Sequence, residues 1–288
     1  MMILHVVPGL ENACSGIAVA ATLIAAEQGA DLVEARLFAR GAGTLDAYDE
    51  VWVHSCWLPM TLRSCWRALR AGKPLVRMTH ANLDPVRLKY HGWKKWLVGP
   101  IERWCLRRCD RIVATCEAEK GWIEKYLGKH CPPIEVTDIK RFFNLNPVNS
   151  VNPVRKKLHL LYLGRRHPLK GLEFLEAAVK GIEGVELRVV SNAFGEEKEK
   201  VWKWCDVLVL PTLSENFGLV IAEALERGKR VITTDGAPAW GEELTGLTGF
   251  TGLYSGYEGR LIYLKGYRDG TDEERVELLK KAIERICK

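Results

Sequence analysis

The sequence contains no hydrophobic run long enough to cross a membrane. A spanning helix needs about 18–20 apolar residues, and the longest candidate, residues 16–26, is followed at once by Glu27 and Gln28. The N-terminus also lacks the basic segment that opens a secretory signal peptide. We therefore expect a soluble, unexported protein of the cytoplasm, either free or bound peripherally to the inner face of the plasma membrane.

Several binding signatures are also missing. No Gly-x-Gly-x-x-Gly follows the first predicted strand and no Gly-x4-Gly-Lys-Ser/Thr occurs, which removes the main support for a nicotinamide-dependent dehydrogenase or a P-loop nucleotidase. The nine cysteines include no Cys-x-x-Cys pair. We expect buried free thiols, no disulfide and no metal. Metal ligation by neighbours such as His54 with Cys56 stays open as an alternative.

What the sequence does contain is a regular alternation of short β-type runs and helical patterns. The predicted strands are 3–7, 32–38, 51–55, 75–79, 111–116, 134–137, 158–163, 187–191, 207–210 and 230–234. The predicted helices are 16–27, 61–71, 93–108, 117–126, 196–205 and 271–287, with two more beginning near 170 and 218. Continuous Val, Ile and Leu strands separated by helices are typical of parallel sheets covered on both faces.

A turn-rich segment divides this alternation into two runs. Residues 144–153 hold four asparagines and two prolines, which indicates a linker. At 288 residues the chain has room for two domains. We predict an α/β protein with two doubly wound, Rossmann-like domains that face a cleft, an N-terminal domain 1–150 and a C-terminal domain 151–288. The last helix, about 271–288, packs on its own domain or back on the first.

The positive charge is concentrated in one part of the chain. Residues 63–111 carry a net charge of +10, whereas the rest of the chain carries −4. Within this part, tryptophans recur at helical spacing among lysines and arginines from Trp93 to Arg108. A basic helix with interleaved tryptophans suits an anionic membrane surface. An ordinary surface helix with tryptophans in the core explains the pattern equally well, and no nucleic-acid-binding signature accompanies the charge.

The most informative segment is 207–225, where a buried strand ends and a loop leads into a helix. The loop presents Glu215, Asn216 and Gly218, and Glu223 follows on the helix. A glycine at a helix start leaves the first backbone N–H groups open to an anion. Glu215 and Glu223 can each accept hydrogen bonds from a polyhydroxylated ligand. The alternatives are that Glu215 caps the helix and that Glu223 is solvated.

A second segment, 161–172, runs from a strand into a basic turn. Arg165 and Lys170 place two cations after the carboxyl end of the strand, which suits a diphosphate. Either segment alone is explained by a solvated loop. The two together, near strand ends of one domain, indicate a nucleoside diphosphate as ligand.

These two motifs carry a family resemblance. Gly-Arg-x4-Lys-Gly at 164–171, together with Glu-x7-Glu at 215–223 that begins in Ser-Glu-Asn-Phe-Gly at 214–218, resembles the retaining nucleotide-sugar glycosyltransferases of family 4 (group 1), which have the GT-B fold. The likeness is strong over residues 158–240. It is moderate at 78–85, which is similar to members that build bacterial lipopolysaccharide or exopolysaccharide, and faint at Ser15-Gly16.

The resemblance implies roles by position. Arg165 and Lys170 would hold the donor diphosphate and offset the charge of the leaving group, which is electrostatic catalysis. Glu215 would contact the donor sugar and Glu223 the ribose. The other implied donor-site positions are Asn216, Phe217, Gly218 and Leu219, through backbone N–H groups, His80 at a sugar hydroxyl, and Gly16 at a close backbone approach. As an isolated residue, His80 is more often a core or loop histidine.

The sequence departs from the family pattern at one place. Members usually have a further helix and strand between the strands predicted at 187–191 and 207–210, in a region that commonly contacts the nucleobase. Only 192–206 fills that gap here, so the second domain is compact and the base is not identified.

The resulting expectation is a metal-independent, retaining hexosyltransferase without a cofactor. It would use a nucleoside-diphosphate sugar and a glycan or lipid-linked glycan acceptor in the synthesis of a bacterial surface polysaccharide, and it would bind no nucleic acid. Two alternatives stay open. One is a sugar-nucleotide hydrolase, epimerase-like enzyme or phosphorylase on the same scaffold, and the other is a non-catalytic nucleotide-sugar-binding protein.

Overall fold

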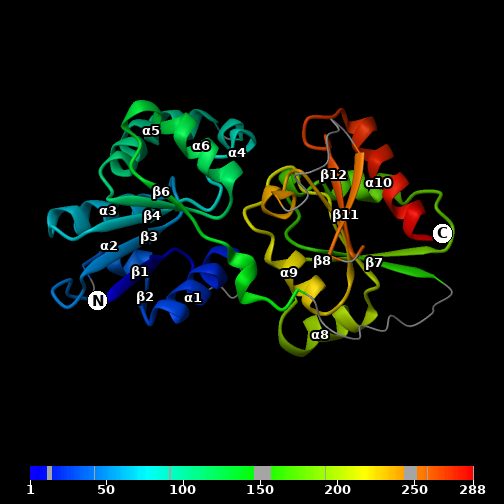
Figure 1. Ribbon diagram of the computed structural model, residues 1–288, viewed down its shortest axis with the longest axis horizontal. Coiled ribbons are helices and arrows are strands. Elements are labelled where there is room, and N and C mark those ends of the chain that lie inside the picture. Colours follow the sequence, from blue (N-terminus) through cyan, green and yellow to red (C-terminus); the bar gives the residue numbers. More distant parts are fainter. Residues whose placement is uncertain are drawn as a thin grey trace. The chain divides into compact units, whose positions relative to one another are not determined.

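The chain folds into two compact units, Met1–Ile139 and Lys140–Lys288, each built around its own sheet (Figure 1). This computed structural model describes residues 1–11, 15–41, 43–90, 92–145, 157–191, 193–242, 252–257 and 259–287. The predicted linker at 144–153 lies mostly outside these residues. Among the helices that are described, none is both long enough and apolar enough to span a bilayer.

The first unit is a six-stranded, wholly parallel sheet in the order β2-β1-β3-β4-β5-β6. Its strands are β1 (Ile3–Val7), β2 (Asp31–Glu34), β3 (Glu50–His54), β4 (Leu75–Met78), β5 (Arg111–Ala114) and β6 (Ile134–Val136). All residues of β1, β3 and β4 are buried. The prediction of a parallel, doubly covered sheet is confirmed for this unit.

Helices cover both faces of this sheet. They are α1 (Gly16–Gln28), α2 (Ala35–Ala39), α3 (Pro59–Arg70), α4 (Pro85–Lys89), α5 (Gly92–Arg107) and α6 (Glu117–Leu127), with short 3₁₀ helices at Gly128–His130 and Ile139–Phe142. Buried residues of α2, α3, α5 and α6 form one core with the sheet, whereas α1 packs with Val7 in a separate cluster. Figure 1 shows α1 on the opposite side of the sheet from α5 and α6.

A buried ion pair joins α5 to β4. Arg77 Nη2 donates to Glu102 Oε1 at 2.8 Å, and both side chains are fully buried. The same guanidinium donates to the carbonyl of Ser55 at 2.7 Å and to the sulfur of Cys65 at 2.9 Å. Because a buried charge is costly unless its polar atoms are paired, these bonds favour the position of α5 in which Glu102 meets Arg77.

Two local predictions in this unit were wrong. Residues 32–38 were expected to form one strand, but the strand ends at Glu34 and α2 begins at Ala35. The Glu34 carboxylate caps the new helix by accepting the N–H of Arg36 at 3.3 Å, and this local bond competes with strand continuation. Helix α4 was not predicted, although Asp84 caps it through the N–H of Val86 at 2.9 Å.

The second unit also has a six-stranded sheet, in the order β11-β12-β10-β9-β7-β8. Its strands are β7 (Leu158–Leu163), β8 (Val185–Val190), β9 (Val207–Leu210), β10 (Arg230–Thr234), β11 (Gly252–Gly256) and β12 (Leu261–Lys265). All are parallel except β11, which pairs antiparallel with β12. Strands β11 and β12 were not predicted, and their antiparallel pairing forms one edge of the sheet.

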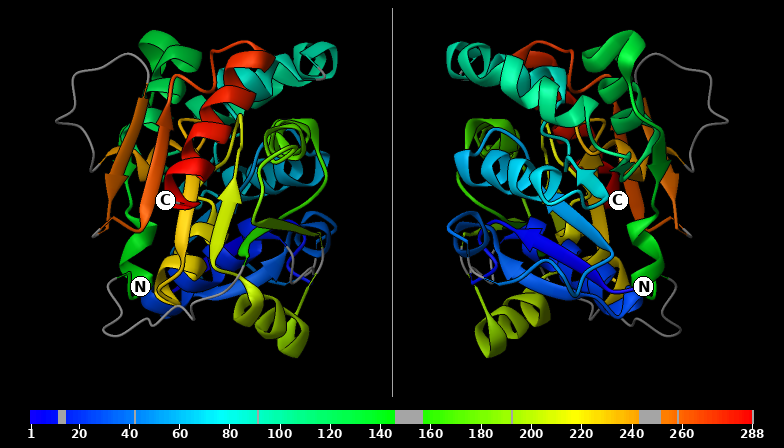
Figure 2. Two further views of the ribbon diagram at one scale, coloured as in Figure 1. Left: turned by 90° about the vertical axis from the view of Figure 1, so that its right-hand side faces the viewer. Right: turned by 90° about the vertical axis from the view of Figure 1, so that its left-hand side faces the viewer.

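The helices of this unit are α7 (Leu172–Ala178), α8 (Gly195–Trp204), α9 (Leu219–Glu226) and α10 (Asp272–Cys287), with 3₁₀ turns at Pro168–Lys170 and Pro238–Trp240. Between β8 and β9 the residues that the structure describes, 191 and 193–206, form α8 as their one helix. Helix α10 lies along α7 and β12 (Figure 2), and Leu279, Ala282 and Ile283 belong to the core of this unit. Its apolar face is therefore buried on its own domain, and packing on the first domain is not needed to bury it.

Three loops meet at the carboxyl edge of the second sheet. Gly171 has φ +62°, and a Cβ there would lie less than 3 Å from the carbonyl oxygen of Pro211; a Cβ on Gly236 would clash in the same way with the carbonyl of Thr212. The N–H of Leu213 donates to the carbonyl of Leu169 at 2.9 Å. Only glycine allows backbones to approach so closely, so the loops after β7, β9 and β10 form one cluster.

We expect Gly171→Ala to separate these loops. The new Cβ meets a backbone carbonyl that no side-chain rotation can move, and it also strains a left-handed residue, so unfolding should become easier by about 3 kcal/mol. Gly181→Ala is the matched control, because Gly181 also has positive φ but nothing lies within 4 Å of its Cβ position. It should cost about 1 kcal/mol. Equal losses in urea unfolding of the two variants would contradict the close approach.

Candidate functional site

The carboxyl edge of the second sheet brings together the two motifs singled out in the sequence. Lys170 Nζ donates a hydrogen bond to Glu215 Oε2, and the two side chains are only 12% and 18% exposed. Lys170 ends the 3₁₀ turn after β7, whereas Glu215 lies in the loop after β9. A cation and a carboxylate 45 residues apart in sequence are thus held as a half-buried ion pair.

Arg165 lies on the same edge but in solvent. It follows the end of β7, and its carbonyl accepts a hydrogen bond from the Tyr162 hydroxyl at 2.8 Å. Burial, followed by the nearby Glu215 carboxylate, raises the pKa of Tyr162 to about 12, so this hydroxyl remains a donor at neutral pH. The backbone at Arg165 is fixed while its guanidinium remains accessible to an anionic ligand.

The loop before α9 is shaped by Gly218. This residue has φ +72° and precedes the first residue of the helix, Leu219. A Cβ on Gly218 would crowd Ile221 Cδ1 at 3.0 Å and Glu215 Cγ at 3.3 Å. Since the first N–H groups of a helix have no partner within it, this turn presents backbone donors beside the Glu215 carboxylate.

Glu215 does not cap α9. Its Oε1 accepts the N–H of Asn216 at 3.0 Å, its Oε2 accepts Lys170, and the residue at the N-cap position is Gly218. The alternative interpretation of Glu215 as a helix cap is therefore wrong.

Phe217 contributes differently from its neighbours. Its side chain is buried and its ring centroid lies 5.1 Å from that of Trp240, while its carbonyl accepts the Trp240 indole N–H. Another ring, that of Phe143, stacks on it at 6.2 Å. The side chain is thus part of the core, and only the backbone of Phe217 is placed to serve a ligand.

Glu223 is half-buried and paired. Lys198 on α8 donates a hydrogen bond to its Oε1 at 2.9 Å, and the same ammonium lies 2.7 Å from its Oε2 as an ion pair. The alternative interpretation of Glu223 as a merely solvated residue is wrong. Sequence reasoning missed Lys198, because it lies in a run of alternating charges, Glu196 to Lys200, that gives no signal for any one of its members.

His80 lies in the first unit, just after β4, and is buried. It has φ +52°, which is unusual for a residue with a side chain. Its Nε2 lies 2.9 Å from Nδ1 of His54. Desolvation, together with the positive charge of the nearby Arg87, lowers the pKa of His80 to about 3. His80 is therefore neutral at physiological pH.

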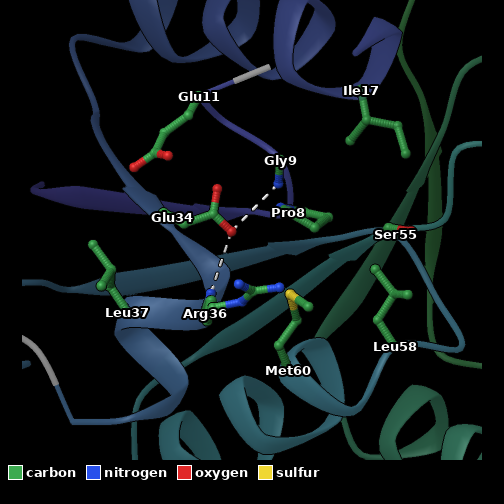
Figure 3. A pocket seen from close by; sticks show the side chains of 10 residues that line it. All are labelled: Pro8, Gly9, Glu11, Ile17, Glu34, Arg36, Leu37, Ser55, Leu58 and Met60. Atoms are coloured by element: carbon green, nitrogen blue, oxygen red, sulfur yellow. Dashed lines mark hydrogen bonds between the residues drawn. The ribbon is translucent and has the colours of Figure 1, made fainter.

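The first unit also contains a cavity of about 880 Å³ near the carboxyl ends of β1, β2 and β3. Figure 3 shows Ile17, Leu58 and Met60 among its lining side chains. Glu34, on the same wall, accepts N–H groups of the loop after β1, at 3.3 Å from Gly9 and 2.7 Å from Leu10. The cavity is therefore mainly apolar, with a carboxylate that holds its own loop.

Gly16 lies beside this cavity rather than in its lining. It is the first residue of α1 and is exposed. Ser15 caps the helix through the N–H of Ala18 at 3.3 Å, and the next residue, Ile17, lines the cavity. Because glycine has no side chain, position 16 adds no bulk at the exposed start of α1.

Comparisons with known proteins agree with this architecture. Residues 16–145 match the family model described as Glycosyltransferase Family 4, and residues 147–252 match the one described as Glycosyl transferases group 1. The chain belongs to the family 4, group 1 glycosyltransferases. Its two Rossmann-like domains have the GT-B architecture of this family, which confirms the predicted fold class and the resemblance.

Solved structures with the same fold include two enzymes of sugar metabolism. Sucrose-phosphate synthase from Thermosynechococcus elongatus aligns with a TM-score of 0.68 and 17% identity over 99% of this chain and 89% of its own. The lipopolysaccharide outer core galactosyltransferase WaaB aligns with a TM-score of 0.58 and 14% identity over 100% of this chain and 92% of its own.

A curated relative is the uncharacterized 41.2 kDa protein in the cps region of Klebsiella pneumoniae. It is 23% identical over an alignment 184 residues long, which covers 54% of this chain. The matched part spans about half, 51%, of the length of that relative.

The basic helix of this glycosyltransferase, α5, exposes its tryptophans. Trp93, Trp96 and Trp104 are 64%, 78% and 42% exposed, and Leu97 and Ile101 between them are 58% and 55% exposed. The interpretation that placed these tryptophans in the core is therefore wrong. The exposed basic residues Lys94 and Arg108 lie over the rings of Trp93 and Trp104, at 5.5 and 4.8 Å.

The cysteines are described at eight positions, all as free thiols, and six of them are buried. Four of the buried ones lie near Arg77: Cys56, Cys65, Cys105 and Cys109. Within the described ranges there is no group of three His, Cys, Asp or Glu side chains placed to hold a metal ion.

The buried histidines predict a pH dependence of stability. Desolvation lowers the pKa of His5 to about 4, with partial compensation from Gln28 and Glu50, and lowers that of His54 as well as that of His80. The unfolded chain, with pKa values near 6.5, therefore binds protons as the pH falls from 7 to 5, and the folded chain does not. The free energy of unfolding is therefore highest above pH 6.5. Below this pH it falls by about 1.4 kcal/mol per pH unit for each histidine that binds a proton only in the unfolded chain.

The measurement is urea unfolding at pH 7.0, 6.0 and 5.0. His5→Gln should reduce the slope of unfolding free energy against pH by about one proton. The control is His130→Gln, which removes an exposed histidine that is not one of the three buried ones. It should leave the slope of unfolding free energy against pH almost unchanged. A slope that is the same in His5→Gln and in the parent protein would show that His5 is protonated in the folded state.

Proposed function

We propose that this chain is a retaining, metal-independent hexosyltransferase that uses a nucleoside-diphosphate sugar as donor and needs no cofactor. The observation that carries the proposal is the half-buried pair of Lys170 and Glu215 beside the start of α9. In this loop cluster, Lys170 and the backbone N–H groups at the start of α9 can bind phosphate oxygens. The Glu215 carboxylate beside them can accept hydrogen bonds from sugar hydroxyls.

Each residue has a distinct role in the proposed reaction. Arg165 and Lys170 bind the diphosphate and stabilise its negative charge as the sugar leaves, so that these side chains do what a divalent cation does in other enzymes. Glu215 orients the donor sugar, and backbone N–H groups from Asn216 to Leu219 bind sugar and phosphate oxygens. Glu223 accepts the ribose hydroxyls.

In the first unit, His80 contacts a hydroxyl of the donor sugar, and Gly16 allows close approach of a substrate at the start of α1. The acceptor is a glycan or lipid-linked glycan of a bacterial surface polysaccharide, in lipopolysaccharide core or exopolysaccharide synthesis. This part of the proposal is supported by the likeness in fold to a lipopolysaccharide galactosyltransferase and by the distant relative from a cps region.

The roles of Lys170 and Glu215 can be separated by two kinds of binding measurement. Lys170→Met should weaken the binding of the nucleoside diphosphate and lower kcat by about 100-fold or more, because it removes charge stabilisation of the leaving group. Glu215→Gln should leave nucleoside-diphosphate binding within a few-fold of the parent but reduce the preference for the nucleotide sugar. Lys180→Met, at an exposed lysine of the same unit, is the control.

Calorimetry with a panel of nucleoside diphosphates and nucleotide sugars, with and without EDTA, gives the affinities. Transfer is followed by diphosphate release with a glycan acceptor, and the anomeric configuration of the product by NMR. Unchanged diphosphate affinity in Lys170→Met would contradict the phosphate assignment. Free sugar released without any acceptor product would favour a hydrolase, and tight binding without turnover a non-catalytic binding protein.

We further propose that the exposed face of α5 binds an anionic membrane surface at the inner side of the plasma membrane. The proposal is supported by three exposed tryptophans and by the net charge of +10 over residues 63–111. Indole rings favour the headgroup region of a bilayer, and each lysine or arginine near an anionic surface contributes about 1 kcal/mol. A free protein in the cytoplasm is the alternative.

Vesicle sedimentation tests this proposal. The protein should bind vesicles rich in phosphatidylglycerol and bind pure phosphatidylcholine weakly. The double variant Lys94→Glu/Arg108→Glu should reduce binding at least 10-fold, because two charges are reversed and the net charge falls by four units. Lys180→Glu/Lys200→Glu changes the net charge equally on the second unit and should have a much smaller effect. Equal losses in both double variants would show non-specific attraction and no site on α5.

A further inference from the structure

Three buried histidines of the first unit form a continuous series of side-chain hydrogen bonds. Nδ1 of His5 lies 2.9 Å from Nε2 of His54, and Nδ1 of His54 lies 2.9 Å from Nε2 of His80. At the other end, Nε2 of His5 lies 2.8 Å from the side-chain oxygen of Gln28. Gln28 ends α1, so the series runs from the surface of that helix to the loop after β4.

The sheet register places these residues in line. His5 on β1 is paired with Trp52 on β3, so both side chains point to the same face. His54 lies two residues after Trp52 and therefore shares this face, and His80 follows two residues after its partner Met78 on β4. The ring of Trp52 stacks on His5 at 4.9 Å, which limits rotation of that imidazole.

All three rings are neutral, because each is removed from water. The charged groups around them are Glu50 near His5, Arg77 near His54, and Arg87 near His80. Both arginines oppose protonation, and only Glu50 favours it. A neutral imidazole carries one N–H donor and one acceptor nitrogen, so in a series of three neutral rings every proton must point in the same direction.

The amide of Gln28 sets that direction. Its oxygen can only accept, so Nε2 of His5 carries the proton and Nδ1 accepts. His54 must then donate from Nε2 to His5 and accept at Nδ1, and His80 must donate from Nε2 to His54. The acceptor nitrogen of His80 is consequently Nδ1.

We propose that Gln28, His5 and His54 are positioning residues that fix His80 in the Nε2–H tautomer, so that its Nδ1 accepts a hydrogen bond from a hydroxyl of the sugar substrate. The last clause rests on the proposed function, in which His80 contacts the donor sugar. The tautomer itself is a property of the free protein. This tautomer implies selectivity for a sugar that carries a hydroxyl at the position bound by Nδ1. The corresponding deoxy or O-methylated sugar has no hydroxyl proton to donate there and should be a poorer substrate.

The test exchanges the group at position 28. Gln28→Lys replaces the acceptor by a side chain that can only donate, and position 28 is half-buried, so the ammonium group can be accommodated. The series should reverse, and His80 should shift towards the Nδ1–H tautomer. Gln28→Met has neither donor nor acceptor and should leave a mixture of the two. Ala26→Lys adds the same charge at an exposed site on α1 and should change nothing.

The readout is the pair of ring nitrogen shifts of His80 in the ¹⁵N-histidine-labelled full chain, assigned with His80→Gln and measured at pH 7. A simple loss of packing would not exchange protonated and unprotonated nitrogens. An Nδ1–H tautomer of His80 in the parent protein would overturn the proposal. So would a tautomer that is unchanged in both Gln28→Lys and Gln28→Met.

The second arm measures sugar transfer. Reversal of the series in Gln28→Lys should lower kcat/KM for the donor about 10-fold, the effect of one hydrogen bond, while affinity for the nucleoside diphosphate alone stays the same. If no nucleotide sugar supports transfer by the parent protein, the proposed function fails, and the NMR arm still decides the tautomer. If the tautomer reverses without any change in kcat/KM, the contact of Nδ1 with the substrate is overturned.

Discussion

The close backbone approach at Gly171 and Gly236 is the constraint on which the second unit's candidate site depends. Each glycine faces a carbonyl of the loop after β9, at Pro211 and at Thr212. With a side chain at either position, the loops after β7 and β10 would have to move away from that loop. Lys170 directly precedes Gly171, so the distance between Lys170 and Glu215 depends on the contact that these glycines permit.

The first unit depends on buried polar groups in a comparable way. Arg77 with Glu102 anchors α5, and the histidine series joins β1, β3 and the loop after β4. Such groups destabilise a fold when one partner is missing, because a buried donor or acceptor then loses its hydrogen bond to water without replacement. These buried polar groups therefore contribute less to the net stability of the unit than to the selection of one strand register. A slip of one residue in that register would separate the histidine rings.

Several strands could be predicted to the residue, because they are rich in aliphatic and β-branched residues. β1, β7, β9 and β10 begin and end as the sequence indicated, since burial of both sheet faces favours such residues along the strand. The wrong or missing elements, α2, α4 and the β11–β12 pair, are short. For α2 and α4 a single cap, at Glu34 and at Asp84, marks the start of the helix, and hydrophobic periodicity does not reveal such a contact.

The candidate site was predictable only in part, for a related reason. Glu215 and Lys170 lie in glycine-flanked loops after strands, where the parallel sheet itself predicts ligands. Lys198 and the pair His5 and His54 have no such signature. Whether Lys198 meets Glu223 depends on the packing of α8 on α9, and whether the histidines meet depends on register across three strands. Both contacts depend on tertiary packing, which a local sequence pattern does not reveal.

The ion pair of Lys170 and Glu215 also bears on how a donor could bind. A half-buried ammonium is costly if it stays unpaired. In the free protein Glu215 supplies its partner; in the proposed complex a phosphate oxygen takes that place. Most of the desolvation of the lysine has then already taken place before the donor arrives, so binding replaces one partner by another and leaves the cation's position almost unchanged. Such preorganisation lowers the free-energy cost of binding. It also places the positive charge of Lys170 where negative charge develops on the leaving diphosphate. It also releases Glu215 at the moment a sugar hydroxyl becomes available to bond with it, which couples recognition of the phosphate to recognition of the sugar.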